Sequence, residues 1–80
     1  MSSRPAWYER LGARPVKTIE GEDGFRYEIA VRKDETSGAV YIFVAKVVPS
    51  GTFAKSILRI PLGLARRIAE AVIEAANEAK

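Results

Sequence analysis

The stretch FRYEIAVR, residues 25–32, alternates apolar and polar side chains with a period of two. That period is the spacing of a β-strand that buries one face and exposes the other. Two turn sequences frame it, GEDG at residues 21–24 and DETSG at residues 34–38. Clusters of glycine, aspartate and serine of this kind end a strand and reverse the chain. We therefore expect this strand to pair with a neighbour on each side.

The flanking sequence supplies those neighbours. Residues 14–20 predict a first strand, and residues 39–48, AVYIFVAKVV, form an apolar run interrupted only by Lys46. A run so rich in β-branched and aromatic residues is typical of a central strand covered on both faces. After the turn PSG at residues 49–51, residues 52–60 complete a four-stranded antiparallel meander.

A long C-terminal amphipathic helix follows the fourth strand. Pro61 suits the first position of a helix, because its missing amide hydrogen has no partner there, and residues 62–79 are strong helix formers. Their apolar stripe is wider than one sheet face needs. We expect one part of it to pack on the sheet. The surplus predicts a homo-oligomer, at least a dimer, with an interface of Leu64, Ile68, Ala69, Val72, Ile73 and Ala76.

The N-terminal arm, residues 1–13, contains a short helical turn over residues 3–12, with Pro5 in its first turn and Gly12 where a helix can end left-handed. Trp7 and Leu11 share a face because they are four residues apart. Trp7 either closes the edge of the core or stacks on a ligand. The remainder, residues 14–80, is predicted to be a single β-β-β-β-α domain of the α+β class.

The residue types on which catalysis and metal binding depend are missing. The chain has no Cys and no His, which excludes a disulfide, a thiolate zinc site and a histidine base. Its acids fall in turns or repeat at i, i+4 along the polar side of the helix, as solvated faces do. We predict a chain that is not an enzyme, with no catalytic residue, metal, cofactor or small-molecule substrate.

The hydropathy and the composition suggest the cellular compartment and the kind of organism from which the chain comes. No stretch approaches the ~20 apolar residues that cross a bilayer, and the N-terminus lacks the apolar core of a signal peptide. We expect a soluble cytoplasmic protein with no membrane partner. The absence of Gln and the single Asn, Asn77, fit a thermophilic source. A chain of eighty residues buries only a thin core, so we expect pairing of copies to add to its stability.

The placement of charge is more informative than the net value of +3. Glu28 is the only acid well inside a predicted strand. The same strand segments carry many cations: Arg14, Lys17, Arg26, Arg32, Lys33, Lys46, Lys55 and Arg59. A basic sheet of this kind attracts phosphate backbones through counterion release and without reading sequence.

The pairing of strands assigns these cations to a face. Val48 opposite Thr52 places a predicted core face on Val40, Ile42, Val44, Leu58 and Ile60. The other face then presents Tyr41, Phe43, Phe53, Lys55, Ile57 and Arg59. Arg26 and Arg32 join it if the helix covers Phe25, Tyr27, Ile29 and Val31. A change of one residue in the turn at 34–38 would reverse that strand.

Aromatic rings interleaved with cations on an open sheet suit single-stranded nucleic acid, because unpaired bases stack on rings while cations follow the phosphates. We predict non-catalytic, largely sequence-independent binding of single-stranded nucleic acid, DNA in the first place, through Arg26, Arg32, Tyr41, Phe43, Phe53, Lys55 and Arg59. RNA fits the same chemistry. The next candidate site is the N-terminal arm with Trp7, Arg4, Arg10 and Arg14.

Three alternatives stay open. The rings could be buried in a dimer interface or under the N-terminal arm. The same face could meet a partner protein, which would make the chain a structural or protein-interaction module. A basic sheet could also package duplex DNA as a chromatin protein. Rising salt weakens a nucleic-acid contact steeply, whereas a mainly apolar protein contact holds.

The element order and the step from Ile60 through Pro61 to Leu62 resemble the single-stranded DNA binders related to Whirly proteins and to the transcriptional positive cofactor four. The compact size, the cysteine-free composition and the arginine-rich helix start look closer to the archaeal ThermoDBP-related proteins. The resemblance covers residues 14–79 and lies in element order and surface character. It implies a dimer whose interface includes the helices and whose basic groove holds nucleic acid.

Overall fold

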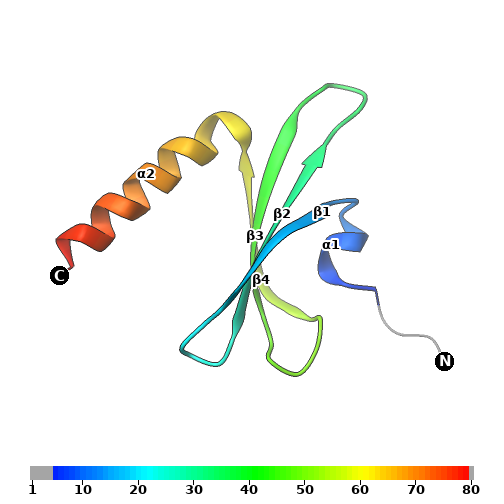
Figure 1. The fold of residues 1–80 in the computed structure, drawn as a ribbon. Coiled ribbons are helices and arrows are strands. Elements are labelled where there is room, and N and C mark those ends of the chain that lie inside the picture. Colours follow the sequence, from blue (N-terminus) through cyan, green and yellow to red (C-terminus); the bar gives the residue numbers. More distant parts are fainter. Residues whose placement is uncertain (1–4, 80) are drawn as a thin grey trace.

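The computed structural model describes residues 5–79, and the expectations that fall on residues 1–4 and on Lys80 lie outside it. Within that range the chain forms a four-stranded antiparallel sheet followed by a long helix, as predicted (Figure 1). The strand order is β1-β2-β3-β4. The elements are α1 (Trp7–Arg10), β1 (Arg14–Glu20), β2 (Arg26–Lys33), β3 (Val40–Val47), β4 (Ala54–Pro61) and α2 (Leu62–Glu78). Pro61 ends β4 and stands at the N-cap position of α2, one residue before the first helical position that was predicted for it, so no linker separates strand from helix.

The predicted core residues of β3 and β4 share a face, but the register differs by two residues from Val48 opposite Thr52, which would pair Val44 with Ser56. Val44 pairs with Leu58 and Ile42 with Ile60. Residues paired across neighbouring strands lie on one side of the sheet. One side, called the α1 face below, therefore carries Arg26, Glu28, Ala30, Arg32, Tyr41, Phe43, Ala45, Val47, Ile57 and Arg59. The opposite side, called the open face, carries Ile19, Tyr27, Ile29, Val31, Ile42, Val44, Lys46, Leu58 and Ile60.

The core lies on the opposite side of the sheet from the predicted one. Trp7 is 6% exposed and packs with Ala30, Phe43, Ala45 and Val47 on the α1 face. Within the predicted core set of Val40, Ile42, Val44, Leu58 and Ile60, Ile60 is buried, Leu58 is 56% exposed and the other three are half-buried. The expectation that the C-terminal helix covers this face is therefore wrong. Period-two alternation fixes which residues share a face, but not which helix covers it.

The two helices lie on opposite sides of the sheet, and they pack differently (Figure 1). α2 leaves the end of β4 and extends away from the strands, and within Leu62–Glu78 no residue is buried. α1 has four residues, yet it places its indole directly on the sheet. The two alanines beneath that ring, Ala30 and Ala45, are fully buried and leave room for it. A single large aromatic ring therefore supplies the cover that α2 does not.

Polar contacts hold the Trp7 ring in place. Its indole Nε1 donates a hydrogen bond to Glu28 Oε1 at 2.7 Å, and its ring meets Phe43 edge-on at 6.5 Å between centroids. The backbone N–H of Ala6 donates to Glu9 Oε1, which closes the first turn of α1. Gly12, with φ of 66°, turns the chain from α1 toward β1. Of the two roles weighed for Trp7, closure of the core is the one that the structure shows.

Removal of the Trp7 ring should lower the free energy of unfolding more than removal of an exposed ring does. Trp7→Ala is expected to lower the free energy of unfolding by about 3–5 kcal/mol, because it leaves a cavity over Phe43. Phe53→Ala, at a ring that is 67% exposed, should change it by about 0.5 kcal/mol or less. Urea unfolding followed by circular dichroism measures both. Equal losses for the two variants would contradict this placement of the core.

Candidate nucleic-acid interface

Tyr41 lies between two guanidinium groups at one end of the α1 face. Arg59 Cζ is 5.0 Å from the centroid of its ring, and Arg32 Cζ is 5.5 Å from it. The three side chains come from β2, β3 and β4, because Arg32 pairs with Tyr41 and Arg59 pairs with Phe43, two residues further along β3. Tyr41 is half-buried and Arg59 is exposed. This cluster brings together three of the predicted nucleic-acid-binding residues.

Arg32 also ties the N-terminal arm to the sheet. Its Nη1 donates a hydrogen bond to the carbonyl oxygen of Leu11 at 3.1 Å, and its Cζ lies 5.7 Å from the ring centroid of Phe43. The side chain is therefore anchored before any ligand arrives. An anchored cation loses little conformational entropy when it meets an anion. Arg59 has the greater exposure of the two and is the better placed to touch a phosphate.

The prediction that Phe43 stacks on bases is wrong. Its ring is 2% exposed and lies beneath Trp7, which is the alternative of burial under the N-terminal arm. A base cannot reach a ring that another aromatic ring already covers. Tyr41 packs at the edge of this cluster and stays half-buried, and Phe53 is 67% exposed.

Arg26 has a structural role instead of the predicted contact with phosphate. Its Nε forms an ion pair with Glu28 Oε2 at 3.2 Å, and Nη1 donates to the carbonyl oxygen of Pro49 at 3.1 Å. Nη2 donates to the carbonyl oxygen of Gly51. The guanidinium thus fastens the β3–β4 turn to β2, and Glu28 offsets its charge. Sequence reasoning placed it on the correct face but could not show these acceptors.

Lys55 lies on the other side of the sheet from Tyr41. The register shifts where β4 passes Lys46 and Val47, since Lys46 pairs with Ser56 while Val47 pairs with Ala54. Lys55 is the additional residue of this irregularity. Its Nζ lies 5.7 Å from the ring centroid of Phe25, beside Lys46, whose Nζ lies 4.4 Å from the same ring. The predicted grouping of Lys55 with Arg59 is therefore wrong.

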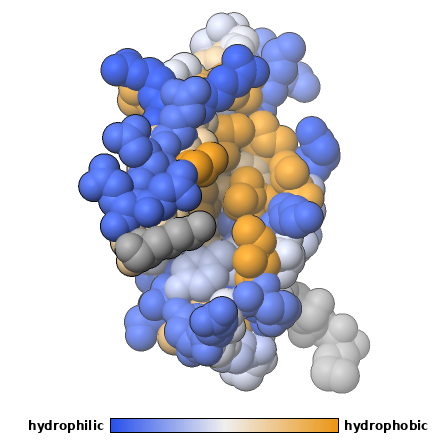
Figure 2. Space-filling view, turned by 60° about the vertical axis from the view of Figure 1, so that its left-hand side comes forward, coloured by the Kyte–Doolittle hydropathy of each residue, from blue (hydrophilic) through white to orange (hydrophobic). Residues whose placement is uncertain are grey.

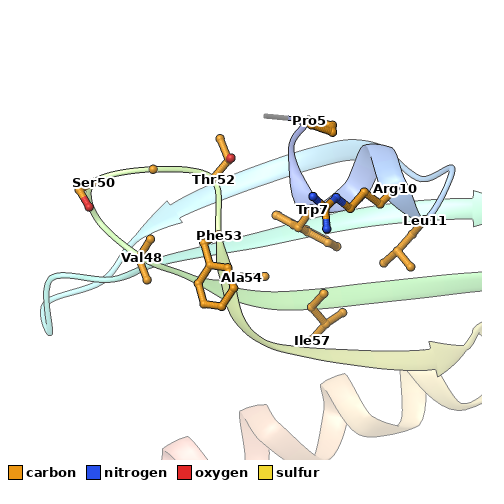
Figure 3. Close-up of a pocket in the computed structure, with 11 residues that line it drawn as sticks. Pro5, Trp7, Arg10, Leu11, Val48, Ser50, Thr52, Phe53, Ala54 and Ile57 are labelled. Atoms are coloured by element: carbon orange, nitrogen blue, oxygen red, sulfur yellow. The ribbon is translucent and has the colours of Figure 1, made fainter. Parts of the chain in front are cut away.

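A hollow of about 630 Å³ occupies the other end of the α1 face. Figure 3 shows Trp7, Arg10 and Leu11 on one side of it and Phe53 and Ile57 on the other. Phe53 is 67% exposed, and Arg10 is an exposed cation on the opposite side of the hollow. The sequence placed Arg10 only in the second candidate site, the N-terminal arm. Its position at the hollow follows from the docking of α1, which the sequence pattern does not reveal.

The turn carboxylates that are held by hydrogen bonds lie away from this interface. The hydroxyl of Tyr27 donates to Asp23 Oδ2 at 2.6 Å, and that bond, with one from the backbone of Phe25, lowers the pKa of Asp23. Backbone donors at Thr36 and Ser37 lower the pKa of Asp34 in the next turn. Both groups therefore stay ionised to a lower pH than an ordinary aspartate does. An ionised carboxylate has no proton to donate as a general acid.

Within residues 5–79, no group of three or more acidic side chains is placed to hold a metal ion. Across the same residues, no helix has the length and apolar character that crossing a membrane requires. In comparisons with protein-family models, curated proteins and solved structures, nothing matches this chain.

The role of Arg26 can be separated from that of a phosphate contact. Arg26→Ala should lower the free energy of unfolding by about 1–3 kcal/mol, because it removes an ion pair and two hydrogen bonds to the β3–β4 turn. It should leave the salt dependence of nucleic-acid binding unchanged. Urea unfolding and oligonucleotide titration at several salt concentrations measure the two effects. An unchanged stability together with a lower salt slope would show that Arg26 contacts phosphate.

Proposed function

We propose that this chain binds single-stranded nucleic acid without chemical change, through the two ends of the α1 face. The observation that carries the proposal is the half-buried ring of Tyr41 between Arg59 and Arg32, at 5.0 and 5.5 Å. A ring in this setting offers a surface on which a base can stack, and its flanking cations meet the phosphates on either side. Guanidinium groups next to aromatic rings also stack on bases themselves.

A second contact point supports the same function. Phe53 and Arg10 repeat the combination of an exposed ring and a cation at the hollow. β4 separates Phe53 from Arg59 by six residues, which is about 20 Å along a strand. A flexible single strand can follow the face from one end to the other. A rigid duplex keeps its bases stacked inside and has none to give to these rings.

A rival function is binding of a partner protein in the hollow. Apolar side chains supply most of its lining, including Leu11, Val48, Ala54 and Ile57. Apolar pockets with a few polar groups are common sites for side chains and small ligands. The two functions differ in their response to salt, because counterion release weakens nucleic-acid binding as salt rises while apolar contact holds.

The direct test is a titration of fluorescently labelled oligonucleotides with the protein, followed by anisotropy. Single strands and duplexes of DNA and RNA are compared at low and at moderate salt. The proposal expects tighter binding to single strands than to duplexes, and weaker binding at the higher salt. Duplex binding that equals or exceeds single-strand binding would favour a chromatin protein. If the protein bound none of the oligonucleotides at low salt, the proposal would be wrong.

Three variants assign the contacts. Arg59→Ala should reduce the dependence of log affinity on log salt by about 0.7, as expected for one lost phosphate contact. Tyr41→Ala should cost about 1–3 kcal/mol and leave the salt slope unchanged, since stacking releases no counterions. Lys55→Ala is the matched control, because it removes an exposed β4 cation on the other side of the sheet. Its affinity should stay near the parental value.

Circular dichroism must show that each variant keeps its fold. If Lys55→Ala lowers the salt slope as much as Arg59→Ala does, binding depends on overall charge and the proposed contacts are wrong. The same conclusion follows if a folded chain with both Tyr41→Ala and Arg59→Ala binds at parental affinity. In that case the site lies outside the Tyr41 cluster, which consists of Tyr41, Arg32 and Arg59.

A further inference from the structure

Apolar side chains gather on the side of the molecule that α1 does not cover. Figure 2 shows them as one surface in the middle of the view, framed by hydrophilic residues. The open face contributes Leu58 at 56% and Ile19 at 47% exposure, together with the half-buried Ile29, Val31, Ile42 and Val44. α2 contributes exposed side chains as well: Leu62, Leu64, Ile68, Val72 and Ile73. We call this set the open apolar surface.

The chain leaves more area exposed than is typical of a folded monomer of this length. A monomer of this length exposes about 4,800 Å², whereas this chain exposes 6288 Å². Its radius of gyration is 14.1 Å, against roughly 12 Å for a compact domain of this length. The difference in exposed area, about 1,500 Å², exceeds the ~800 Å² that each partner buries in a stable interface. The surplus is therefore large enough to form a complete interface.

The charges on α2 indicate what covers this surface. Arg66 and Arg67 lie in its first half, while Glu70, Glu74 and Glu78 occupy the second. Glu78 lies in the last turn, where the helix dipole favours cations. Three glutamates at i, i+4 spacing also repel one another along a single helix. A second α2 laid antiparallel would place its arginines beside these glutamates and relieve both conflicts.

We propose that the open apolar surface binds a second copy of this chain. The two copies are related by a two-fold axis, with the α2 helices antiparallel and each helix packed between its partner and the partner's open face. The surface is self-complementary, because it contains a convex helix and the flat sheet face that such a helix can cover. This arrangement adds to the small contact that α2 makes with β3 and β4 within one chain. It leaves the Tyr41 cluster of each copy on the outside.

Sedimentation equilibrium tests the pairing without reference to nucleic acid. The parental chain should have the mass of a dimer at high micromolar concentration. Leu58→Lys should give a monomer, because it places a charge in the centre of the open face. Phe53→Lys is the matched control, since Phe53 is exposed to a similar degree outside the open apolar surface and its replacement should leave the dimer intact.

Charge exchange tests the antiparallel arrangement and does not depend on the folding of Leu58→Lys. A chain with Arg66→Glu and Arg67→Glu, and another with Glu74→Lys and Glu78→Lys, should each self-associate about tenfold more weakly. An equimolar mixture of the two should recover the dimer, since opposite charges then face each other. Glu22→Lys with Glu35→Lys makes the same charge change in two turns and should have no effect.

Two results would overturn the proposal. A monomer mass for the parental chain at high micromolar concentration would mean that another protein covers the open apolar surface. A dimer that both charge exchanges leave unchanged, with no gain on mixing, would exclude antiparallel pairing of the helices. Since neither result depends on oligonucleotide binding, failure here is distinct from failure of the proposed function.

Discussion

The indole ring of Trp7, packed on Phe43 and hydrogen bonded to Glu28, organises the rest of the structure. A four-stranded sheet has two faces, and a chain this short has little material with which to cover both. Because α1 brings one large ring onto a patch of alanine and valine, the centre of the α1 face is closed by very few residues. Glu28, the acid inside β2, accepts from this ring and also holds Arg26.

This closure determines what the two ends of the α1 face can do. Trp7 occupies the centre, so Tyr41 and its two arginines are left at one end, and Phe53 with Arg10 is left at the other. It also determines what happens on the opposite side. With the core already formed under α1, α2 makes only a small contact with its own sheet and presents its apolar side together with the open face. Binding and pairing are thereby proposed for opposite sides of one thin layer.

The sequence was sufficient to predict the four strands, their order and which residues of β3 and β4 share a face, because alternation and turn residues are local signals. It missed the register of these two strands by two residues. It was insufficient to predict which helix covers each face, because that depends on tertiary packing. Small residues at Ala30 and Ala45 are the signal that could have indicated a ring above the α1 face. Lys55 was misplaced because one additional residue in β4 reverses its side, and no residue type marks that irregularity.

The central claim is that α1 divides the molecule into a nucleic-acid face and a pairing face. Mapping of amide chemical shifts during titration with a short single-stranded oligonucleotide tests it most directly, at a protein concentration held constant. We expect shifts at Tyr41, Arg59, Phe53 and Arg10, and unchanged signals at Leu58 and along α2. Shifts concentrated on Leu58 and α2, with Tyr41 and Arg59 unmoved, would contradict the division.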